Sequence, residues 1–428
     1  MERKYIVLMA PVQTLSGYGA RSRDIATSLI NLEYDVEILS LPWGDTPFTG
    51  LNLNTESHRQ IKTRIVSNLK RKPDIFIHVG IPNEFQPIGD INIGITAGIE
   101  TTICRPEWID GCNKMDLVLT SSNHSQNVFK SINFEKVEND TKKVVDVLKL
   151  TKPCEVLFEG INDEIYKKKS STFTALNEIK EDFCFLFVGH WLQGDLGHDR
   201  KDIGMLVHTF LNTFKKKSAK NRPALILKTS HANFSNLELH EIQRKINYIQ
   251  EMVINQNEWT GSLPKIYVLH GDLTDSEMNE LYNHDKVKAM ISFTKGEGFG
   301  RPLLEFTTTG KPVIASAWSG QLDFLDPEYS YLLPGTMTHV HPSAANDWIL
   351  KEGEWFTVNY TYASQIMDSC HKMYESFLEK SRKHTRLTKS NYTIKKMQDK
   401  LSEILNNLPL LLQPKNEFVQ IKLPQRIS

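Results

Sequence analysis

Short apolar segments alternate with longer amphipathic segments along this chain of 428 residues, and the alternation runs twice. Short apolar runs predict buried strands, and apolar residues at helical spacing between them predict helices. Strands separated by helices form parallel sheets that are covered on both faces. The chain is therefore predicted to be an α/β protein with two doubly wound domains. The strands are predicted at 5–9, 35–41, 75–79, 91–96 and 117–121 in the first half, and at 183–188, 224–227, 266–269, 289–293 and 313–315 in the second.

Helix signals lie between these strands. Apolar spacing predicts helices over 20–32 and around 61–69, and Ser122 is a predicted N-cap for a helix that runs towards Ile132. Thr274 followed by Glu277 is a capping-box pattern, which marks the start of another helix.

The alternation stops between residues 133 and 172, where Lys and Asp are frequent, and we place the inter-domain linker near 165–180. Helices are predicted over 362–407, and the tail from Leu408 contains three Pro and is predicted to be extended. The predicted parts are a first domain over 1–170, a second domain over 171–385, and a C-terminal helix and tail over 386–428.

Charge and cysteine content indicate which partners and which cellular compartment to expect for this protein. The 51 basic and 51 acidic residues balance, so the overall charge gives no argument for a nucleic-acid or membrane partner. Five Cys, an odd number without a Cys-x-x-Cys spacing, indicate a reducing compartment. The first apolar run, 5–12, is too short for a signal sequence or a membrane span. We therefore expect a cytoplasmic protein without a membrane partner.

The segment 295–305 reads Lys-Gly-Glu-Gly-Phe-Gly-Arg-Pro-Leu-Leu-Glu and lies between a predicted strand and a predicted helix. Its three glycines let backbone N–H groups approach a ligand closely, and a helix N-terminus favours a phosphate. Glu297 and Glu305 can accept hydrogen bonds from hydroxyl groups. The combination suits a ligand that carries both a phosphate and a sugar.

This Glu-Gly-Phe-Gly-x-Pro-x-x-Glu pattern, with Gly-Lys-Pro-Val-Ile-Ala at 310–315 and Ser319-Gly320, resembles the signature of a large retaining glycosyltransferase family of the Glu-x7-Glu (family 4-like) type. The resemblance implies two Rossmann-like domains that face each other across a cleft (GT-B), with a last helix that crosses back onto the first domain. It implies transfer of a sugar from a nucleoside diphosphate sugar to an acceptor hydroxyl, with retention of anomeric configuration. It implies no cofactor and no metal.

The resemblance also assigns donor-binding residues. Glu305 is expected to bind the donor ribose. Glu297, which is also expected to be catalytic, would hold the transferred sugar and the distal phosphate together with the backbone amides of Gly298, Phe299 and Gly300.

Positive charge is needed for the diphosphate. The family usually has an Arg after the first strand of the second domain, but this chain has His190 there. The candidates are Lys201, which matches the family best, Arg200 and Lys228. The alternative for each is an ordinary surface charge.

Two turns in the first half are further candidates. Gly17 and Gly19 let the first strand–helix turn approach the donor phosphates, although Ser22 breaks the dinucleotide-binding fingerprint. Glu100 follows a predicted strand and is expected to orient or deprotonate the acceptor hydroxyl, with helix capping as the alternative.

The acceptor is left open. Residues 10–24 look like glycosyltransferases of large tailed bacteriophages, some of which modify hydroxymethylated DNA bases, so modified DNA is a second hypothesis, in which the host cytoplasm is the compartment. It predicts a basic surface near the cleft, for which 70–72 and 215–222 are candidates. A catalytically silent nucleotide-sugar-binding protein is the alternative from a different class. Donor base, donor sugar and oligomeric state are also left open.

Overall fold

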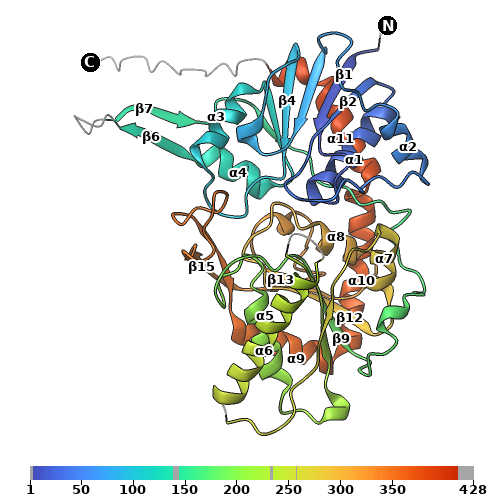
Figure 1. The fold of residues 1–428 in the computed structure, drawn as a ribbon, viewed down its shortest axis with the longest axis vertical. Helices are drawn as coiled ribbons and strands as arrows, with labels where there is room; N and C mark the ends of the chain where they lie inside the picture. Colours follow the sequence, from blue (N-terminus) through green and yellow to red (C-terminus); the bar gives the residue numbers. More distant parts are fainter. Residues whose placement is uncertain (1–2, 138–143, 232–234, 257, 413–428) are drawn as a thin grey trace, which may run out of the picture.

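The computed structural model describes residues 3–137, 144–231, 235–256 and 258–412. It shows an α/β fold with two six-stranded parallel sheets, one in each of two lobes (Figure 1). Each sheet is flanked by helices, as the doubly wound pattern requires. The predicted fold class is confirmed.

The first sheet contains all five strands predicted in the first half of the chain, with β8 added at one edge. Its order is β2-β1-β3-β4-β5-β8. Residue 5 pairs with residue 35, so β1 and β2 begin at the same end of the sheet. The strands are β1 Tyr5–Ala10, β2 Asp35–Ser40, β3 Ile75–Val79, β4 Ile91–Thr96, β5 Leu117–Thr120 and β8 Cys154–Val156.

The first and third helices predicted for this lobe, over 20–32 and after Ser122, are confirmed, but the second is wrong, and a further helix, α3 Pro106–Lys114, was not predicted. Helix α2 spans Glu56–Lys62, not the predicted region around 61–69. Ile65 forms a bridge with Ile38 of β2, and the backbone N–H of Val66 donates to the carbonyl of Ile38 at 3.0 Å. These apolar residues therefore extend the sheet edge, although their spacing also fits a helix. The others are α1 Gly17–Asn31, α3 Pro106–Lys114 and α4 Asn123–Ser131, of which α4 has the predicted N-cap Ser122.

The second sheet likewise contains its five predicted strands and one that was not predicted, β14. Its order is β11-β10-β9-β12-β13-β14. The strands are β9 Cys184–Val188, β10 Ala224–Lys228, β11 Ile266–Leu269, β12 Val287–Ser292, β13 Val313–Ser316 and β14 Tyr331–Leu333. The helices are α5 Ile203–Phe214, α6 Asn236–Gln256, α7 Asp275–Asn283, which has the predicted capping box, and α8 Arg301–Thr307.

Two antiparallel hairpins lie outside the sheets, and neither was predicted. One pairs β6 Asn133–Val137 with β7 Val144–Lys149 and projects from the first lobe (Figure 1). The other pairs β15 Gly335–His339 with β16 Glu354–Val358 and belongs to the second lobe.

The C-terminal helices connect the lobes. Helices α9 Tyr360–Lys372 and α10 Tyr374–Asn391 lie against the second lobe, and α11 Ile394–Asn406 lies beside α1 in the first (Figure 1). Met397 and Leu401 of α11 share a hydrophobic core with Ile25 and Leu29 of α1. The predicted crossing of the last helix back to the first domain is thus confirmed.

The C-terminal tail and the predicted linker both contain ordered, buried residues. The tail begins with a short helix, α12 Leu408–Leu411, and not with an extended chain, because burial of Leu408 holds it against α11. Residues 413–428 of the predicted tail lie outside the described part. Within the predicted linker, Tyr166 and Leu176 are buried in the core of the second lobe. The domain limits at 170 and 385 stay predictions.

A candidate site between the two lobes

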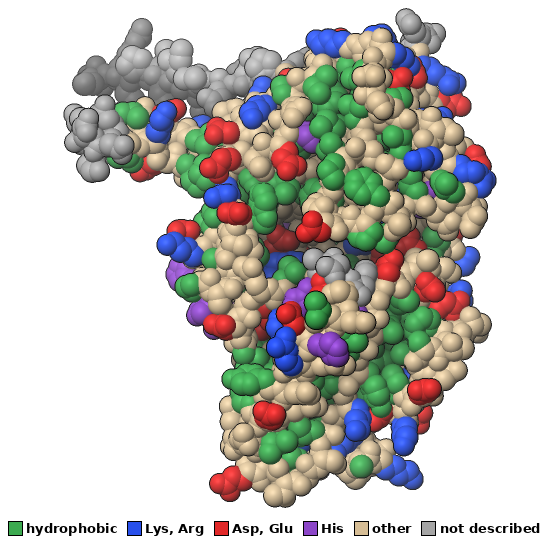
Figure 2. All heavy atoms as spheres, viewed as in Figure 1, with side chains coloured by type: hydrophobic (Ala, Val, Ile, Leu, Met, Phe, Trp, Pro, Cys, Tyr) green, Lys and Arg blue, Asp and Glu red, His purple; other side chains and the backbone are tan. Residues whose placement is uncertain are grey.

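The turn after β12 meets the turn after β4 where the lobes face each other. A Cβ atom at Gly296 would overlap the carbonyl oxygen of Glu100, and one at Gly298 would overlap that of Ala97. Only glycine permits this approach of two backbones. Figure 2 shows a groove between the lobes, with acidic and basic side chains gathered in it. The structure therefore brings the glycine-rich turn and the Glu100 turn together.

Glu297 lies at the centre of this junction and is 8% exposed. It forms an ion pair with Lys201, and its Oε2 lies 3.6 Å from Nη1 of Arg200. Burial pushes the pKa of Glu297 upward, but the two cations outweigh burial and hold that pKa below its ordinary value. Glu297 is therefore a carboxylate at neutral pH, with two cations beside it.

Arg200 connects three groups from both lobes. Its Nη1 donates to the carbonyl of Gly296 at 3.2 Å and lies 3.5 Å from Oε1 of Glu100. Burial opposes the charge of Arg200, yet Glu100 and Glu297 raise its pKa above the ordinary value. Glu100 itself remains partly exposed, at 31% of its side chain.

A buried ion pair between Asp202 and Lys295 holds the segment that carries Arg200 and Lys201 in place. Asp202, in a left-handed conformation with φ 52°, precedes α5 and lies 3.3 Å from Nζ of Lys295. Tyr360 donates to Asp202 at 2.6 Å, and the backbone N–H of Lys295 donates to the carbonyl of Arg200 at 2.8 Å. The segment with Arg200 and Lys201 is thereby tied to the segment that carries Glu297. This pair was not predicted from the sequence, where its signal is a Lys two residues after the apolar run 289–293.

Glu305 lies one helix turn after the glycine-rich turn and is 6% exposed. Nε of Arg301 donates to its Oε1 at 3.0 Å, and the hydroxyl of Tyr282 donates to its Oε2 at 3.2 Å. Burial raises the pKa of Glu305 to about 7. Arg301 also binds Asp24 of α1 at 2.6 Å, which links the second lobe to the first. Arg301 was not predicted to belong to the site, although its spacing of four residues from Glu305 is that of a helical ion pair.

The rest of the glycine-rich turn is held rigidly. Gly300 has φ 98°, which favours glycine, and Phe299 is buried against Phe324. The backbone N–H of Glu297 donates to Oγ of Ser319 at 2.9 Å. The turn is thus shaped by the neighbouring loop before any ligand binds.

The two glycines of the first turn differ in their surroundings. Gly19 contacts the backbone of Thr14, so its lack of a side chain serves the packing of the turn. Gly17 faces open space, and a Cβ there would meet no atom within 4 Å. Between them, the hydroxyl of Tyr18 accepts from the N–H of Ala97 at 3.0 Å, which places this turn beside the Glu100 turn.

Lys228 and His190 lie at the carboxyl ends of β10 and β9. Nζ of Lys228 donates to the carbonyl of Gly271 at 2.5 Å, and Nδ1 of His190 lies 3.1 Å from Oγ of Ser230. Burial, together with the nearby charges of Lys201, Arg200 and Lys228, lowers the pKa of His190 to about 4. A neutral His190 therefore stands beside the cations, where the resembled family has an Arg.

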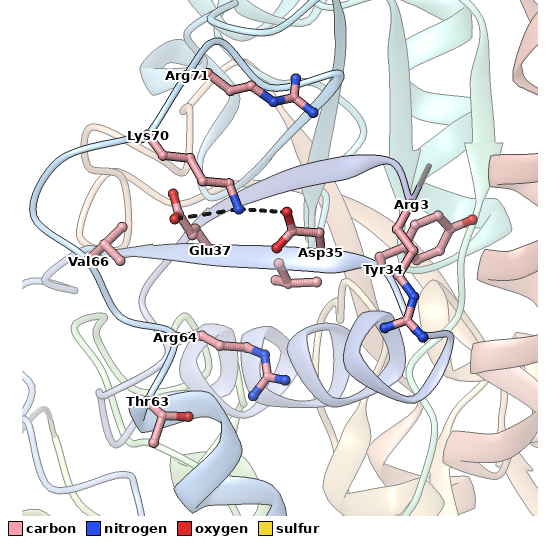
Figure 3. Close-up of a pocket in the computed structure, with 10 residues that line it drawn as sticks. Arg3, Tyr34, Asp35, Glu37, Thr63, Arg64, Val66, Lys70 and Arg71 are labelled. Atoms are coloured by element: carbon pink, nitrogen blue, oxygen red, sulfur yellow. Dashed lines mark hydrogen bonds and ion pairs between the residues drawn. The ribbon is translucent and has the colours of Figure 1, made fainter. Parts of the chain in front are cut away.

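The basic runs expected near the cleft for a DNA acceptor lie elsewhere. Lys70 binds Asp35 at 2.6 Å (Figure 3). Arg71 binds Asp74 at 2.7 Å. Lys70 and Arg71 line an open hollow of about 940 Å³ at the amino ends of β1 and β2. Segment 215–222 precedes β10, again at the amino end of a sheet. Since the groove lies at the carboxyl ends, neither run supplies a basic surface there.

The described residues offer no group of three His, Cys, Asp or Glu side chains arranged for a metal ion. Within the same residues, no helix is both long and apolar enough to cross a membrane.

Solved structures with this fold are found among glycosyltransferases. Sucrose-phosphate synthase from Thermosynechococcus elongatus superimposes with a TM-score of 0.63 at 11% identity, over 95% of this chain and 100% of that chain. Anabaena HepE in complex with UDP-glucose gives 0.60 at 12%, over 95% and 100%. A glycosyltransferase from Rickettsia africae gives 0.59 at 13%, over 96% and 99%. No protein-family model and no curated protein sequence matches the chain. At such identities the likeness shows the GT-B fold alone.

Proposed function

We propose that the protein is a glycosyltransferase that moves a sugar from a nucleoside diphosphate sugar to an acceptor hydroxyl. The observation that carries this proposal is the convergence of Glu297, Lys201 and Arg200 beneath a glycine-rich turn between the lobes. Anabaena HepE was solved with UDP-glucose bound to the same fold, which supports a UDP-sugar as the donor.

The chemistry of transfer matches the charges of this site. Breaking the bond between the sugar and the diphosphate leaves a nucleoside diphosphate, whose negative charge grows in the transition state. Arg200 and Lys201 stabilise that charge, because preorganised cations in a water-poor site act strongly where charge develops. Glu297, with the amides of 298–300, holds the hydroxyl groups of the sugar, and Glu305 holds the ribose.

When the donor binds, Arg200 changes its ion-pair partners. In the absence of ligand its charge is balanced by Glu100 and Glu297. The diphosphate takes over this role, which leaves Glu100 partnerless on the acceptor side of the groove. Glu100 then accepts a hydrogen bond from the acceptor hydroxyl and orients it for attack. The acceptor oxygen bonds to the anomeric carbon as the bond to the diphosphate breaks, and the hydroxyl proton passes to the leaving diphosphate. Attack from the face that the diphosphate leaves gives retention of configuration, as the sequence resemblance implies.

The test is incubation with a panel of UDP-, GDP-, ADP- and TDP-sugars, with release of nucleoside diphosphate and sugar products followed by mass spectrometry. We expect release from at least one donor, and loss of release in Glu297→Gln. Binding of a donor by calorimetry without any release would identify a silent binding protein. Absence of both binding and release would refute the proposal.

The configuration of the product is measured separately. Proton NMR of the anomeric proton in the glycoside product is expected to show the anomer of the donor. The opposite anomer would refute retention while leaving glycosyl transfer intact.

A further inference from the structure

The hairpin β15–β16 brings its connecting loop, 340–353, onto the first lobe (Figure 1). The N–H of Thr102 donates to the carbonyl of Glu354 at 2.9 Å, and the N–H of Glu354 donates to Oγ1 of Thr102 at 2.9 Å. Glu100 lies two residues before Thr102. The chain that leaves the candidate acceptor site therefore runs directly beneath this loop.

A small cavity of about 220 Å³ lies where the loop and the first lobe meet, and two tryptophans, one from each lobe, line it. The ring centroids of Trp108 and Trp348 are 6.4 Å apart, with planes inclined at 42°. Trp108 is buried beside α4, whereas Trp348 is 43% exposed. The cavity is lined by Asn83, Arg105, Glu107, Trp108, Asp347 and Trp348.

The polar groups of this cavity are incompletely paired. Arg105 lies 3.8 Å from Asp347 and 3.9 Å from Glu107, beyond hydrogen-bond distance. These three side chains can therefore exchange their long ion pairs for hydrogen bonds to the hydroxyl groups of a ligand.

We propose that this cavity is an acceptor subsite for one sugar ring of an oligosaccharide or glycoside. A pyranose has an apolar C–H face that packs on tryptophan, while its hydroxyls meet carboxylate, amide and guanidinium groups. The cavity is smaller than the ~300–1,000 Å³ typical of sites for drug-sized ligands, which suits a single ring. This proposal rests on the proposed glycosyl transfer and names its acceptor class.

The position relative to Glu100 places the cavity within reach of an extended acceptor. Glu100 and Arg105 are five positions apart in the sequence, so their Cα atoms lie at most ~18 Å apart. An oligosaccharide can therefore present one hydroxyl at Glu100 while a distal unit packs on the exposed ring of Trp348.

The charge at the cavity favours a saccharide over DNA. Two carboxylates, Glu107 and Asp347, are 63% and 82% exposed at the rim, against one cation, Arg105. Exposed carboxylates repel phosphates, whereas nucleic-acid sites are lined by an excess of Lys and Arg. Carboxylates are good acceptors for sugar hydroxyls.

The loop holds Trp348 in a defined position. Oδ1 of Asn346 accepts from the N–H of Trp348 at 2.8 Å and from that of Ile349 at 2.9 Å. The tryptophan is thus presented by a closed local turn, which reduces the entropy cost of binding. Asn346 is a positioning residue in this arrangement.

The first test needs no donor and no turnover. The protein has seven Trp, and labelling their indole nitrogens with ¹⁵N gives one NMR signal each, assigned with Trp108→Phe, Trp348→Phe and Trp259→Phe. Maltotriose, cellotriose, chitotriose and a short DNA duplex are the probes. We expect at least one oligosaccharide to shift the signals of Trp108 and Trp348 but not that of Trp259, which lies in the second lobe.

The outcomes separate this proposal from the proposed function. Shifts with DNA but not with any oligosaccharide, shifts of all three signals alike, or no shifts at all would overturn the subsite. With a reactive acceptor in hand, Trp348→Ala is expected to raise the acceptor KM about 10-fold, more than the donor KM. Equal changes in both would also overturn it. Loss of donor turnover in the wild type would instead reject the glycosyltransferase, whatever the indole signals show.

Discussion

At the scale of single residues, the two glutamates of the glycine-rich motif have opposite electrostatic environments. Two cations outweigh burial at Glu297 and lower its pKa, while burial dominates at Glu305 and raises its pKa to about 7. Arg301 is shared between Glu305 and Asp24, so it compensates Glu305 only in part. Glu297 is therefore charged over the whole neutral range, and Glu305 titrates within it.

The raised pKa of Glu305 predicts a pH-dependent stability. The folded state binds a proton more tightly than the unfolded chain, so stability from this group is complete below its ordinary pKa of 4.5 and is lost as pH rises through about 7. Relative to the melting temperature of Glu305→Gln, that of the wild type should fall as the pH rises from 5 to 8. Thermal unfolding in the absence of ligand measures this.

Glu277 in the capping box is the matched control. Its side chain accepts from the N–H of Thr274 at 2.8 Å, and this bond lowers its pKa. Its contribution is therefore present above the ordinary pKa of 4.5 and is lost as pH falls, the opposite sense. A Glu305→Gln profile parallel to wild type between pH 5 and 8 would contradict the assignment.

Removal of Lys201 should affect turnover strongly. Lys201→Ala takes away the cation closest to Glu297, and we expect kcat for nucleotide release to fall about 10²-fold, as for loss of one electrostatic contact to the transition state. Circular dichroism checks that the variant is folded. Lys201→Arg keeps the charge and should retain more activity than Lys201→Ala. Full turnover in Lys201→Ala would remove this residue from the donor site.

At the scale of elements, the turn between β12 and α8 and the loop after β13 form one structural unit. Gly300 and Ser319 both have positive φ, 98° and 74°. Ser319 accepts from the N–H of Glu297, and Gly320 donates to the carbonyl of Glu297 at 3.0 Å. These hydrogen bonds hold the positive-φ conformations of Gly300 and Ser319, so the geometry of the glycine-rich turn depends on the loop after β13.

Gly300→Ala tests the left-handed turn. An alanine with positive φ costs about 1–2 kcal/mol, and its Cβ would lie 3.3 Å from Cβ of Gln321. We expect a drop in the free energy of unfolding of about that size, measured by urea denaturation, together with reduced nucleotide release. Gly17→Ala is the control, since Gly17 has open space around it and its stability should change by at most ~0.5 kcal/mol. A Gly300→Ala variant as stable as Gly17→Ala would contradict this account.

At the scale of the whole molecule, charged and polar contacts hold the lobes together around the groove. Arg301 binds Asp24, Arg200 lies beside Glu100, and the N–H of Asn123 donates to Asp323 at 2.9 Å. Helix α11 adds an apolar connection on the other side. Because these charged and polar contacts lie outside the two hydrophobic cores, opening of the lobes can proceed without unfolding either core.

Asp24→Asn should favour the open arrangement. It removes the charge partner of Arg301 across the lobes, and truncating one partner of a buried pair costs about 3–5 kcal/mol where no relaxation is available. Lobe opening provides that relaxation, so we expect a larger radius of gyration by small-angle X-ray scattering and a higher donor KM. Asp399→Asn, which breaks an exposed pair with Lys395, should change neither. An unchanged scattering profile in Asp24→Asn would show that the lobes do not depend on this pair.

Much of the fold was predictable because apolar runs of strand length are buried wherever they occur. All ten predicted strands lie in the two sheets. The misses were short: β8 and β14 have three residues each, and the apolar spacing at 61–69 fits both a helix and an extended edge. Hairpin β15–β16 was missed because each strand has only five residues and neither alternates buried with exposed positions.

The sequence by itself determined the local chemistry: a bare turn with Glu297 and Glu305 at a fixed spacing, at the end of a strand. Tertiary structure decided which charges surround them, because Lys201, Arg200 and Asp24 come from segments up to 281 residues away from Glu305 in the chain. It also decided the Trp108–Trp348 cavity, whose walls come from different lobes. Side-chain spacing is a property of one element, whereas burial, pKa and pairing depend on what folding places opposite it.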